Sequence, residues 1–260
     1  MSYFIRAKEL KDVIDQVLVL DVRKQDEFNE GHIKGAQSIE PSAFSGEGRF
    51  FPKPSELAQV LGEVGVDEQT DLVIYDDGSN RLAAKAWVTL YYLGHEKMQI
   101  LQGGIAAWHN LGEEVTSDQS FLPPVQYSPR LRPEVDVEIA EIKEKMDKVD
   151  SVLIDSRGYE RYIGKKEPKY ERAGHIPGAK NYMSKDVLEH GVWKDREALV
   201  EHFSPLQDAE EVIVSCGTGT SACLNFVALK EAGMNQVKIF AGGFKQWIDE
   251  GNDIHTDDET

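Results

Sequence analysis

The stretch that decides the fold is Ser151–Met183, SVLIDSRGYERYIGKKEPKYERAGHIPGAKNYM, because a shorter version of it occurs earlier in the chain. The earlier copy, Val17–Glu40, has the sequence VLVLDVRKQDEFNEGHIKGAQSIE. Both copies begin with a short apolar run that predicts a buried strand. In each copy this run is followed by Asp-x-Arg, then by a polar helical segment, and then by Gly-His-Ile-x-Gly-Ala. The two copies therefore indicate the same local structure, formed twice.

The similarity extends beyond this stretch to the whole chain. DLVIYDDGSNRLAAKAWVTLYYLG, from Asp71, matches EVIVSCGTGTSACLNFVALKEAG, from Glu211, and MQILQGGIAAWHNLG matches VKIFAGGFKQWIDEG. Matching residues lie about 140 positions apart throughout, which is too long a period for a solenoid and indicates a duplicated domain. Each half alternates short strands with helical patterns, as α/β domains with a mostly parallel sheet do.

Proline marks the boundary between the halves. Four of the ten prolines, Pro123, Pro124, Pro129 and Pro133, fall between the two repeats, where they prevent regular helix and favour an extended linker. We therefore expect a first domain over residues 1–118, a linker over 119–135 and a second domain over 136–260.

Composition limits the partners and the compartment. With 29 basic and 46 acidic residues the net charge is −17, so phosphate backbones and anionic lipid are poor partners, and we expect neither nucleic acid nor membrane binding. No apolar run approaches the roughly 20 residues that span a bilayer, and the first residues lack a signal-peptide pattern. Two cysteines are too few for a disulfide framework. These features predict a soluble, cytoplasmic protein.

Duplication separates structural signals from functional ones. Features present in both halves are expected to serve the fold: the histidines His32 and His175, the strand-end carboxylates Asp21 and Asp155, the arginines Arg23 and Arg157, the turn pairs Gly103-Gly104 and Gly242-Gly243, and the core residues Trp108 and Trp247. The histidines could instead act as general bases. A structural role is favoured because the half without the cysteine keeps its histidine too.

Cys216 has no such counterpart, since Asp76 occupies the matching position. It follows an apolar run, Glu211–Ser215, that predicts a strand, and it precedes a helical pattern over 222–229. Between them the loop Cys216, Gly217, Thr218, Gly219, Thr220, Ser221 can direct backbone N–H groups inward, at a helix N-terminus that should lower the thiol pKa. We predict a nucleophile here; a small buried hydrophobe is the alternative. Cys223 is expected to be a core residue.

Together these motifs resemble the tandem rhodanese sulfurtransferases over nearly the full length. The resemblance rests on GHIPGA at 174–179, DSR at 155–157, the Cys216 loop and a first domain without the cysteine. It implies two rhodanese domains, each a five-stranded parallel sheet between helices. It also implies that Cys216 takes a sulfane sulfur from a donor as a persulfide and passes it to cyanide or a thiol, with a thioredoxin-like reductant as a further partner. No metal or other cofactor is expected.

The loop sequence bears on the donor. In the family, a cationic loop is typical of thiosulfate sulfurtransferases and a neutral one of 3-mercaptopyruvate sulfurtransferases; the loop here is neutral, so 3-mercaptopyruvate is favoured over thiosulfate. The loss of two cations weakens attraction for a dianion more than for a monoanion. By the resemblance, Arg161 and Lys169 would bind the donor, with Arg172 as a nearby substitute. Solvated surface charge is the alternative for all three.

One element of the mercaptopyruvate branch is missing. There, a hydroxyl at the third loop position can pair with a histidine and an aspartate of the first domain. Thr218 supplies the hydroxyl, but the aspartate position falls on Glu40 and the histidine position near Phe51. We therefore expect this relay to be broken.

The sequence leaves three alternative functions. A cysteine phosphatase would need an arginine at Ala222 to clamp phosphate, which makes that activity unlikely. A non-catalytic docking module would not need the thiol. A persulfide carrier would use the same cysteine with a protein as donor and a protein as acceptor.

Overall fold

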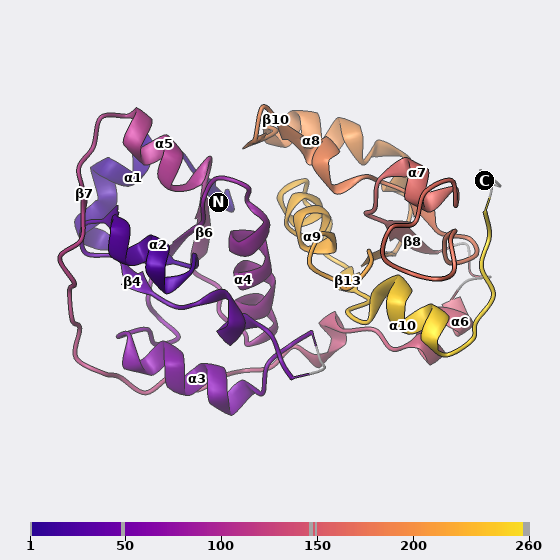
Figure 1. Ribbon diagram of the computed structural model, residues 1–260, viewed down its shortest axis with the longest axis horizontal. Coiled ribbons are helices and arrows are strands. Elements are labelled where there is room, and N and C mark those ends of the chain that lie inside the picture. The colour runs from indigo at the N-terminus through magenta and orange to yellow at the C-terminus, as the bar shows by residue number, and fades with distance from the viewer. Residues whose placement is uncertain (1, 48–49, 146–147, 149, 257–260) are drawn as a thin grey trace. The chain divides into compact units, whose positions relative to one another are not determined.

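The computed structural model describes residues 2–47, 50–145, 148 and 150–256, and the chain divides into two compact units (Figure 1). The first comprises Met1–Arg132 with His190–Trp193, and the second Pro133–Glu189 with Lys194–Thr260. Residues 117–132, within the proline-rich segment, contain neither helix nor strand. Among the described residues, none of the helices combines the length and the apolar character that crossing a bilayer requires.

The first unit is built on a five-stranded parallel sheet in the order β1-β6-β5-β2-β4. Its strands are β1 (Phe4–Ile5), β2 (Leu18–Asp21), β4 (Gln37–Ser38), β5 (Leu72–Tyr75) and β6 (Met98–Leu101). A separate antiparallel pair joins β3 (His32–Ile33) to β7 (Val115–Thr116). Central strand β5 is buried at every position, as expected for a parallel sheet covered on both faces.

Helices cover both faces of this sheet (Figure 1). One face packs against α1 (Ala7–Val13), α2 (Gln25–Glu30) and α5 (Gly104–Asn110), whose Leu10, Phe28 and Trp108 share a core with Val73 and Tyr75. Helices α3 (Pro54–Glu63) and α4 (Arg81–Tyr92) belong to the other face, with the 3₁₀ turns η1 (Ile14–Gln16) and η2 (Pro41–Phe44) completing the unit.

The second unit repeats the architecture with a four-stranded parallel sheet in the order β13-β12-β8-β9. These strands are β8 (Ser151–Asp155), β9 (Lys180–Asn181), β12 (Glu211–Ser215) and β13 (Val237–Ile239). The short strand β10 (Leu188–Glu189) also belongs to this unit, whereas β11 (Val192–Trp193) falls in the segment grouped with the first unit. The predicted fifth strand is reduced to one parallel bridge, Asp136 to Ile239. The 3₁₀ turn η3 (Pro133–Val135) runs up to this bridge, where the Val137 N–H donates to the Ile239 carbonyl at 3.0 Å.

The helices of the second unit confirm the sequence prediction around the cysteine. Strand β12 spans the predicted Glu211–Ser215, and α9 (Ala222–Glu231) begins at the predicted residue. Helices α6 (Ile139–Lys145) and α10 (Gly243–Asp249) share a core that includes Ile213 and Trp247. The remaining elements are α7 (Tyr159–Tyr162), α8 (Arg196–His202), η4 (Ser184–Val187) and η5 (Ser204–Leu206).

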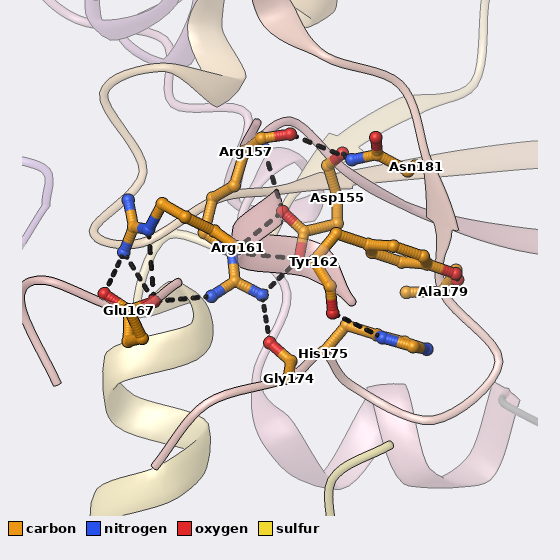
Figure 2. A network of polar contacts seen from close by, with 9 residues as sticks. All are labelled: Asp155, Arg157, Arg161, Tyr162, Glu167, Gly174, His175, Ala179 and Asn181. Carbon is orange, nitrogen blue, oxygen red and sulfur yellow. Dashed lines mark hydrogen bonds and ion pairs between the residues drawn. The ribbon is translucent and has the colours of Figure 1, made fainter. Parts of the chain in front are cut away.

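The Asp-x-Arg motif has the same role in both units, as duplication predicted. Asp155 at the end of β8 accepts two hydrogen bonds from Arg157 Nε, at 3.0 Å each, and one from Nη2 at 2.6 Å, and Arg157 Nη2 also donates to the Gly174 carbonyl at 2.6 Å (Figure 2). Asp21 and Arg23 pair in the same way, and Arg23 donates to the Gly31 carbonyl at 2.8 Å. In each unit the pair fastens a strand end to the segment before the histidine.

The two histidines are structural, as predicted. His32 and His175 are fully buried, and their Nδ1 atoms bond the carbonyls of Phe28 at 2.9 Å and Tyr162 at 2.8 Å. Each imidazole also stacks on the ring of that same residue, with centroids 3.6 and 3.8 Å apart.

Arg23→Leu should lower the free energy of unfolding by about 3–5 kcal/mol, because it leaves the fully buried Asp21 charge without its partner. Denaturant unfolding of the full chain measures this. The exposed Arg6→Leu, which breaks the surface pair with Glu9, should have no measurable effect. If the two variants lost the same stability, the buried pair would not be the fastening that the geometry indicates.

Candidate active site

Two parallel strands bring the candidate groups of the second unit to one edge of the sheet. In the register of β8 and β12, Asp155 lies opposite Ser215, and Cys216 follows directly. The Ser156 N–H donates to the Ser215 carbonyl at 2.7 Å and continues the ladder to the last strand residue. Cys216 thus lies at the carboxyl end of a central strand, where open α/β sheets bind ligands.

The loop after β12 surrounds the Cys216 sulfur with backbone donors. Cys216 is only 3% exposed, and the backbone N–H groups of Thr218, Ser221 and Ala222 each act to lower the pKa of its thiol. Ala222 opens α9, so the sulfur lies at the N-terminus of a ten-residue helix. Converging N–H groups at a helix N-terminus form an anion-binding site. The predicted cradle is therefore present.

The predicted lowering of the Cys216 pKa is wrong for the resting site. Burial raises the pKa of the thiol, the charge of Asp155 raises it further, and the N–H groups of Ala222, Thr218 and Ser221 oppose that rise only in part. Removing a thiolate from water disfavours the charged form more than three backbone hydrogen bonds favour it. Burial thus opposes the backbone N–H groups at Cys216, and the net direction of the pKa is upward.

The start of α10 supports the loop from outside. The Phe244 N–H donates to the Cys216 carbonyl at 2.7 Å and the Lys245 N–H to the Gly217 carbonyl at 3.1 Å. Gly243 has φ +60°, and a Cβ there would lie 2.6 Å from the Cys216 carbonyl oxygen and 2.7 Å from that of Gly217. The prediction that Gly242-Gly243 makes a turn holds, but sequence reasoning missed the contact with the loop.

The first unit builds the same cradle and fills it with its own side chain. Asp76 follows β5 as Cys216 follows β12, and its buried carboxylate accepts hydrogen bonds of 2.9–3.2 Å from four backbone N–H groups, those of Gly78, Asn80, Leu82 and Ala83. The chain therefore contains the loop twice, once closed by a fixed carboxylate and once occupied by a thiol.

Arg161, predicted to bind the donor, lies in a charged cluster of the second unit. Its guanidinium bonds Glu167 through three contacts of 2.8–3.1 Å, and Glu167 also lies 3.4 Å from Arg157 (Figure 2). The Arg161 side chain remains 21% exposed, whereas that of Glu167 is 2% exposed. Arg161 is thus held in place while part of it still faces solvent.

The other two predicted donor ligands have different surroundings. Lys169 is exposed, and its backbone N–H donates to Glu167 Oε1 at 3.0 Å. Arg172 donates from Nη1 to the Asn252 carbonyl at 2.8 Å. The structure thus connects Lys169 with the Arg161 cluster through Glu167, and it ties Arg172 to the segment after α10.

Tyr170 is a residue of the site that sequence reasoning missed. A Cβ on Gly217 would lie 2.6 Å from the Tyr170 hydroxyl oxygen, so this hydroxyl touches the residue next to Cys216. The guanidinium carbon of Arg161 lies 5.5 Å from the centre of the ring, and Arg161 acts to lower the pKa of the hydroxyl. Burial raises the pKa of Tyr170, and the charge of Cys216 contributes to that rise.

A signal for Tyr170 was present in the sequence. The two Asp-x-Arg sites are 134 positions apart (155 − 21) and the two histidines 143 (175 − 32), so the second copy has nine additional residues (143 − 134). This additional segment occurs in one half only, as Cys216 does. It supplies Glu167 and Tyr170.

The remaining predicted residues divide between the loop and the core. Thr218 is exposed on the loop, and Cys223 is fully buried in α9 with its thiol 3.6 Å from the Gly219 carbonyl, so its predicted core position is confirmed. Both cysteines are free thiols. In the first unit, Glu40 accepts a bond from the Gln25 N–H at 3.2 Å, and Phe51 stacks on Tyr92 with centroids 4.2 Å apart.

Known proteins share this architecture. A family model described as a rhodanese-like domain matches residues 6–111 and 138–250. The chain is 32% identical to the probable 3-mercaptopyruvate sulfurtransferase of Pseudomonas aeruginosa, over 85% of this chain and 82% of that protein. It is 30% identical to the sulfur carrier protein TtuD of Thermus thermophilus, over 85% and 83%. The crystal structure of SseA from Escherichia coli, described with the rhodanese fold of 3-mercaptopyruvate sulfotransferases, superposes with a TM-score of 0.82 at 27% identity, covering 94% and 99%.

Gly243→Ala should lower sulfur transfer by about 100-fold, because its Cβ displaces the two loop carbonyls that position Cys216. Gly251→Ala is the matched control: its φ is +74°, but nothing lies within 4 Å of the added Cβ. Both variants incur a left-handed backbone cost of about 1–2 kcal/mol. Steady-state assays compare the activities of the two variants. If Gly243→Ala and Gly251→Ala lost activity to the same extent, the proposed role of Gly243 would be contradicted.

The rate of Cys216 alkylation by iodoacetamide should continue to rise with pH above about 8.5, the ordinary thiol pKa. The reason is that burial raises the pKa of Cys216, so the reactive thiolate becomes the main form only at higher pH. Intact-mass kinetics on a Cys223→Ser background follow this one thiol. A rate that reached its plateau in mildly acidic solution would show a lowered pKa instead.

Proposed function

The chain belongs to the rhodanese family and is a sulfurtransferase, and from that premise we propose that Cys216 carries the transferred sulfur as a persulfide. The observation that carries the proposal is the position of the Cys216 sulfur where the N–H groups of Thr218, Ser221 and Ala222 converge. In the first unit a carboxylate, that of Asp76, fills the equivalent place. The loop therefore suits an anion, and in the second unit the anion is sulfur.

Transfer proceeds in two displacements on sulfur. The Cys216 thiolate attacks the outer sulfur of the donor, the bond from that sulfur to the rest of the donor breaks, and the leaving group keeps the electron pair. An acceptor such as cyanide or a thiolate then attacks the outer sulfur of the persulfide, and Cys216 leaves as the thiolate. The same loop N–H groups stabilise negative charge before and after each step.

The raised pKa of Cys216 is compatible with this role. Intrinsic nucleophilicity of a thiolate falls as its pKa falls, so a buried thiolate attacks strongly once it has formed. After the transfer the negative charge moves from the buried Cys216 sulfur to the outer sulfur. Part of the cost of keeping charge in the buried site is thereby relieved.

We propose 3-mercaptopyruvate as the preferred donor and thiosulfate as the second. Gly217, Thr218, Gly219, Thr220 and Ser221 contribute no cation to the loop, and the nearby Arg161 is paired with Glu167. A site with so little net positive charge attracts a dianion less than it would with an unpaired arginine, while a monoanion depends less on that attraction. The likeness to a probable 3-mercaptopyruvate sulfurtransferase supports the same donor.

Arg161 is the proposed ligand for the donor carboxylate, with Lys169 as the second cation. Arg161 keeps an exposed face, and its planar guanidinium can bond two oxygens at once. Lys169 would act as a point charge. Arg172 holds the Asn252 segment, so among the three predicted cations it is the weakest candidate.

Cyanide and low-molecular-weight thiols are the proposed acceptors, and a thioredoxin-like reductant is a further candidate that would regenerate the Cys216 thiol from the persulfide. Two free cysteines suit a reducing compartment, and we propose a cytoplasmic location on that ground.

Cys216→Ser should abolish thiocyanate formation from cyanide with either donor, because serine forms no persulfide under these conditions. Cys223→Ser, the matched control in α9, should retain activity. The wild type should show a higher kcat/KM with 3-mercaptopyruvate than with thiosulfate. A preference for thiosulfate would overturn the argument from loop charge, and activity in Cys216→Ser would overturn the nucleophile.

A persulfide carrier is the second candidate, favoured by the likeness to the sulfur carrier protein TtuD. The same Cys216 persulfide would then be loaded from a protein donor and discharged to a protein acceptor. Slow wild-type turnover with both small donors, together with rapid loading from a cysteine desulfurase, would favour the carrier over the small-molecule enzyme.

A further inference from the structure

Tyr170 places a hydroxyl group directly on the loop of the nucleophile. An added Cβ at Gly217 would lie 2.6 Å from the hydroxyl oxygen and 3.6 Å from the ring carbon that bears it. Residue 217 must therefore be glycine for the hydroxyl to reach this place. The ring also lies against Phe244, with centroids 6.1 Å apart, and the Phe244 N–H holds the Cys216 carbonyl.

Arg161 determines what this hydroxyl can do. The Arg161 guanidinium lies 5.5 Å from the centre of the Tyr170 ring, and because a guanidinium can only donate hydrogen bonds, the Tyr170 oxygen can face it only as an acceptor. The hydroxyl proton thus remains available for a second partner. Glu167 fixes Arg161 through three contacts, so the orientation of Tyr170 depends on a rigid, largely buried ion pair.

Two other ionisable groups of the second unit, His175 and Lys245, are less suited to give a proton at this loop. His175 is fully buried and uses Nδ1 on the Tyr162 carbonyl. Lys245, whose backbone contacts Gly217, pairs its ammonium group with Asp249 at 2.6 Å. Tyr170 is only partly buried, so a donor bound at the loop could reach its hydroxyl.

We propose that Tyr170 is the acid that protonates the departing group when the sulfur donor is an α-keto thiol such as 3-mercaptopyruvate. This inference rests on the proposed function and deepens it. It assigns to a residue of the second unit the proton delivery that the missing histidine relay would otherwise supply.

The step balances with one shuttled proton. The Cys216 thiolate attacks the donor sulfur, the carbon–sulfur bond breaks, and its electron pair leaves as the enolate of pyruvate. Tyr170 gives its proton to that enolate, which becomes pyruvate. The proton that the donor thiol brought, now on the outer persulfide sulfur, returns to the Tyr170 oxygen. The net products are a Cys216 persulfide anion and pyruvate.

Thiosulfate does not need this acid. Its leaving group is sulfite, a stable anion that departs with the electron pair unprotonated. The second displacement, in which cyanide takes the outer sulfur, also requires no proton. Tyr170 should therefore matter in one half-reaction with one class of donor.

The test separates the half-reactions in wild type, Tyr170→Phe and Tyr159→Phe, the last being an exposed tyrosine in the same unit as matched control. Rapid-quench release of pyruvate measures loading from 3-mercaptopyruvate, release of sulfite measures loading from thiosulfate, and thiocyanate formation by enzyme preloaded with polysulfide measures discharge. In Tyr170→Phe, loading from 3-mercaptopyruvate should be about 100-fold slower, while the other two rates stay at the wild-type level.

Equal losses in loading and discharge would overturn the proposal, because they would show that Tyr170 merely supports the loop. Unchanged loading from 3-mercaptopyruvate would overturn it as well. Failure of the proposed function would give a different result, because the wild type and Tyr159→Phe would themselves release no pyruvate. That result would show that 3-mercaptopyruvate is not a donor for this protein, so no acid would be needed.

Discussion

Backbone N–H groups that converge after a buried parallel strand must be satisfied by an acceptor, and the rest of each unit depends on how that requirement is met. In the first unit the acceptor is the Asp76 carboxylate, bonded by four N–H groups. In the second it is the Cys216 sulfur. A carboxylate that is part of the loop saturates the donors permanently. With a sulfur atom in that place, the same N–H groups can stabilise the negative charge of a thiolate and, in the proposed reaction, that of the persulfide. The two loops thus share their place after a central strand and differ in the group that occupies it, Asp76 in one and Cys216 in the other.

Everything around this loop holds the strand end and the helix start at a fixed separation. The Asp155–Arg157 pair fastens the end of β8 to the Gly174 carbonyl, and the start of α10 holds the carbonyls of Cys216 and Gly217. The first unit has the same frame, with Asp21–Arg23 and with the Ile105 N–H on the Asp76 carbonyl. The frame therefore belongs to the fold, and the chemistry lies in what the second unit adds to it.

What it adds is the segment between α7 and the second histidine. Glu167 and Tyr170 lie there, and Arg161 at the end of α7 contacts both. Their contacts form a series from the Glu167 carboxylate through the Arg161 guanidinium to the Tyr170 phenol, which lies against Gly217. Such a series of side chains can orient a donor while the loop itself stays neutral. In our proposal, donor binding and proton delivery come from this segment, beside Cys216, rather than from the loop itself.

The sequence by itself determined the duplication, the parallel α/β class, the strand at 211–215, the helix that begins at Ala222 and the structural roles of the paired histidines and carboxylates. These follow from local patterns and from repetition, because backbone hydrogen bonding and side-chain periodicity act over a few residues. Only the tertiary structure decided the direction of the Cys216 pKa, the reduction of the fifth strand of the second sheet to one bridge, the partner of Arg172 and the contact of Tyr170 with Gly217. Each of these depends on what packs against a residue from distant parts of the chain. The cost of removing charge from water is set by that packing, and no local pattern encodes it.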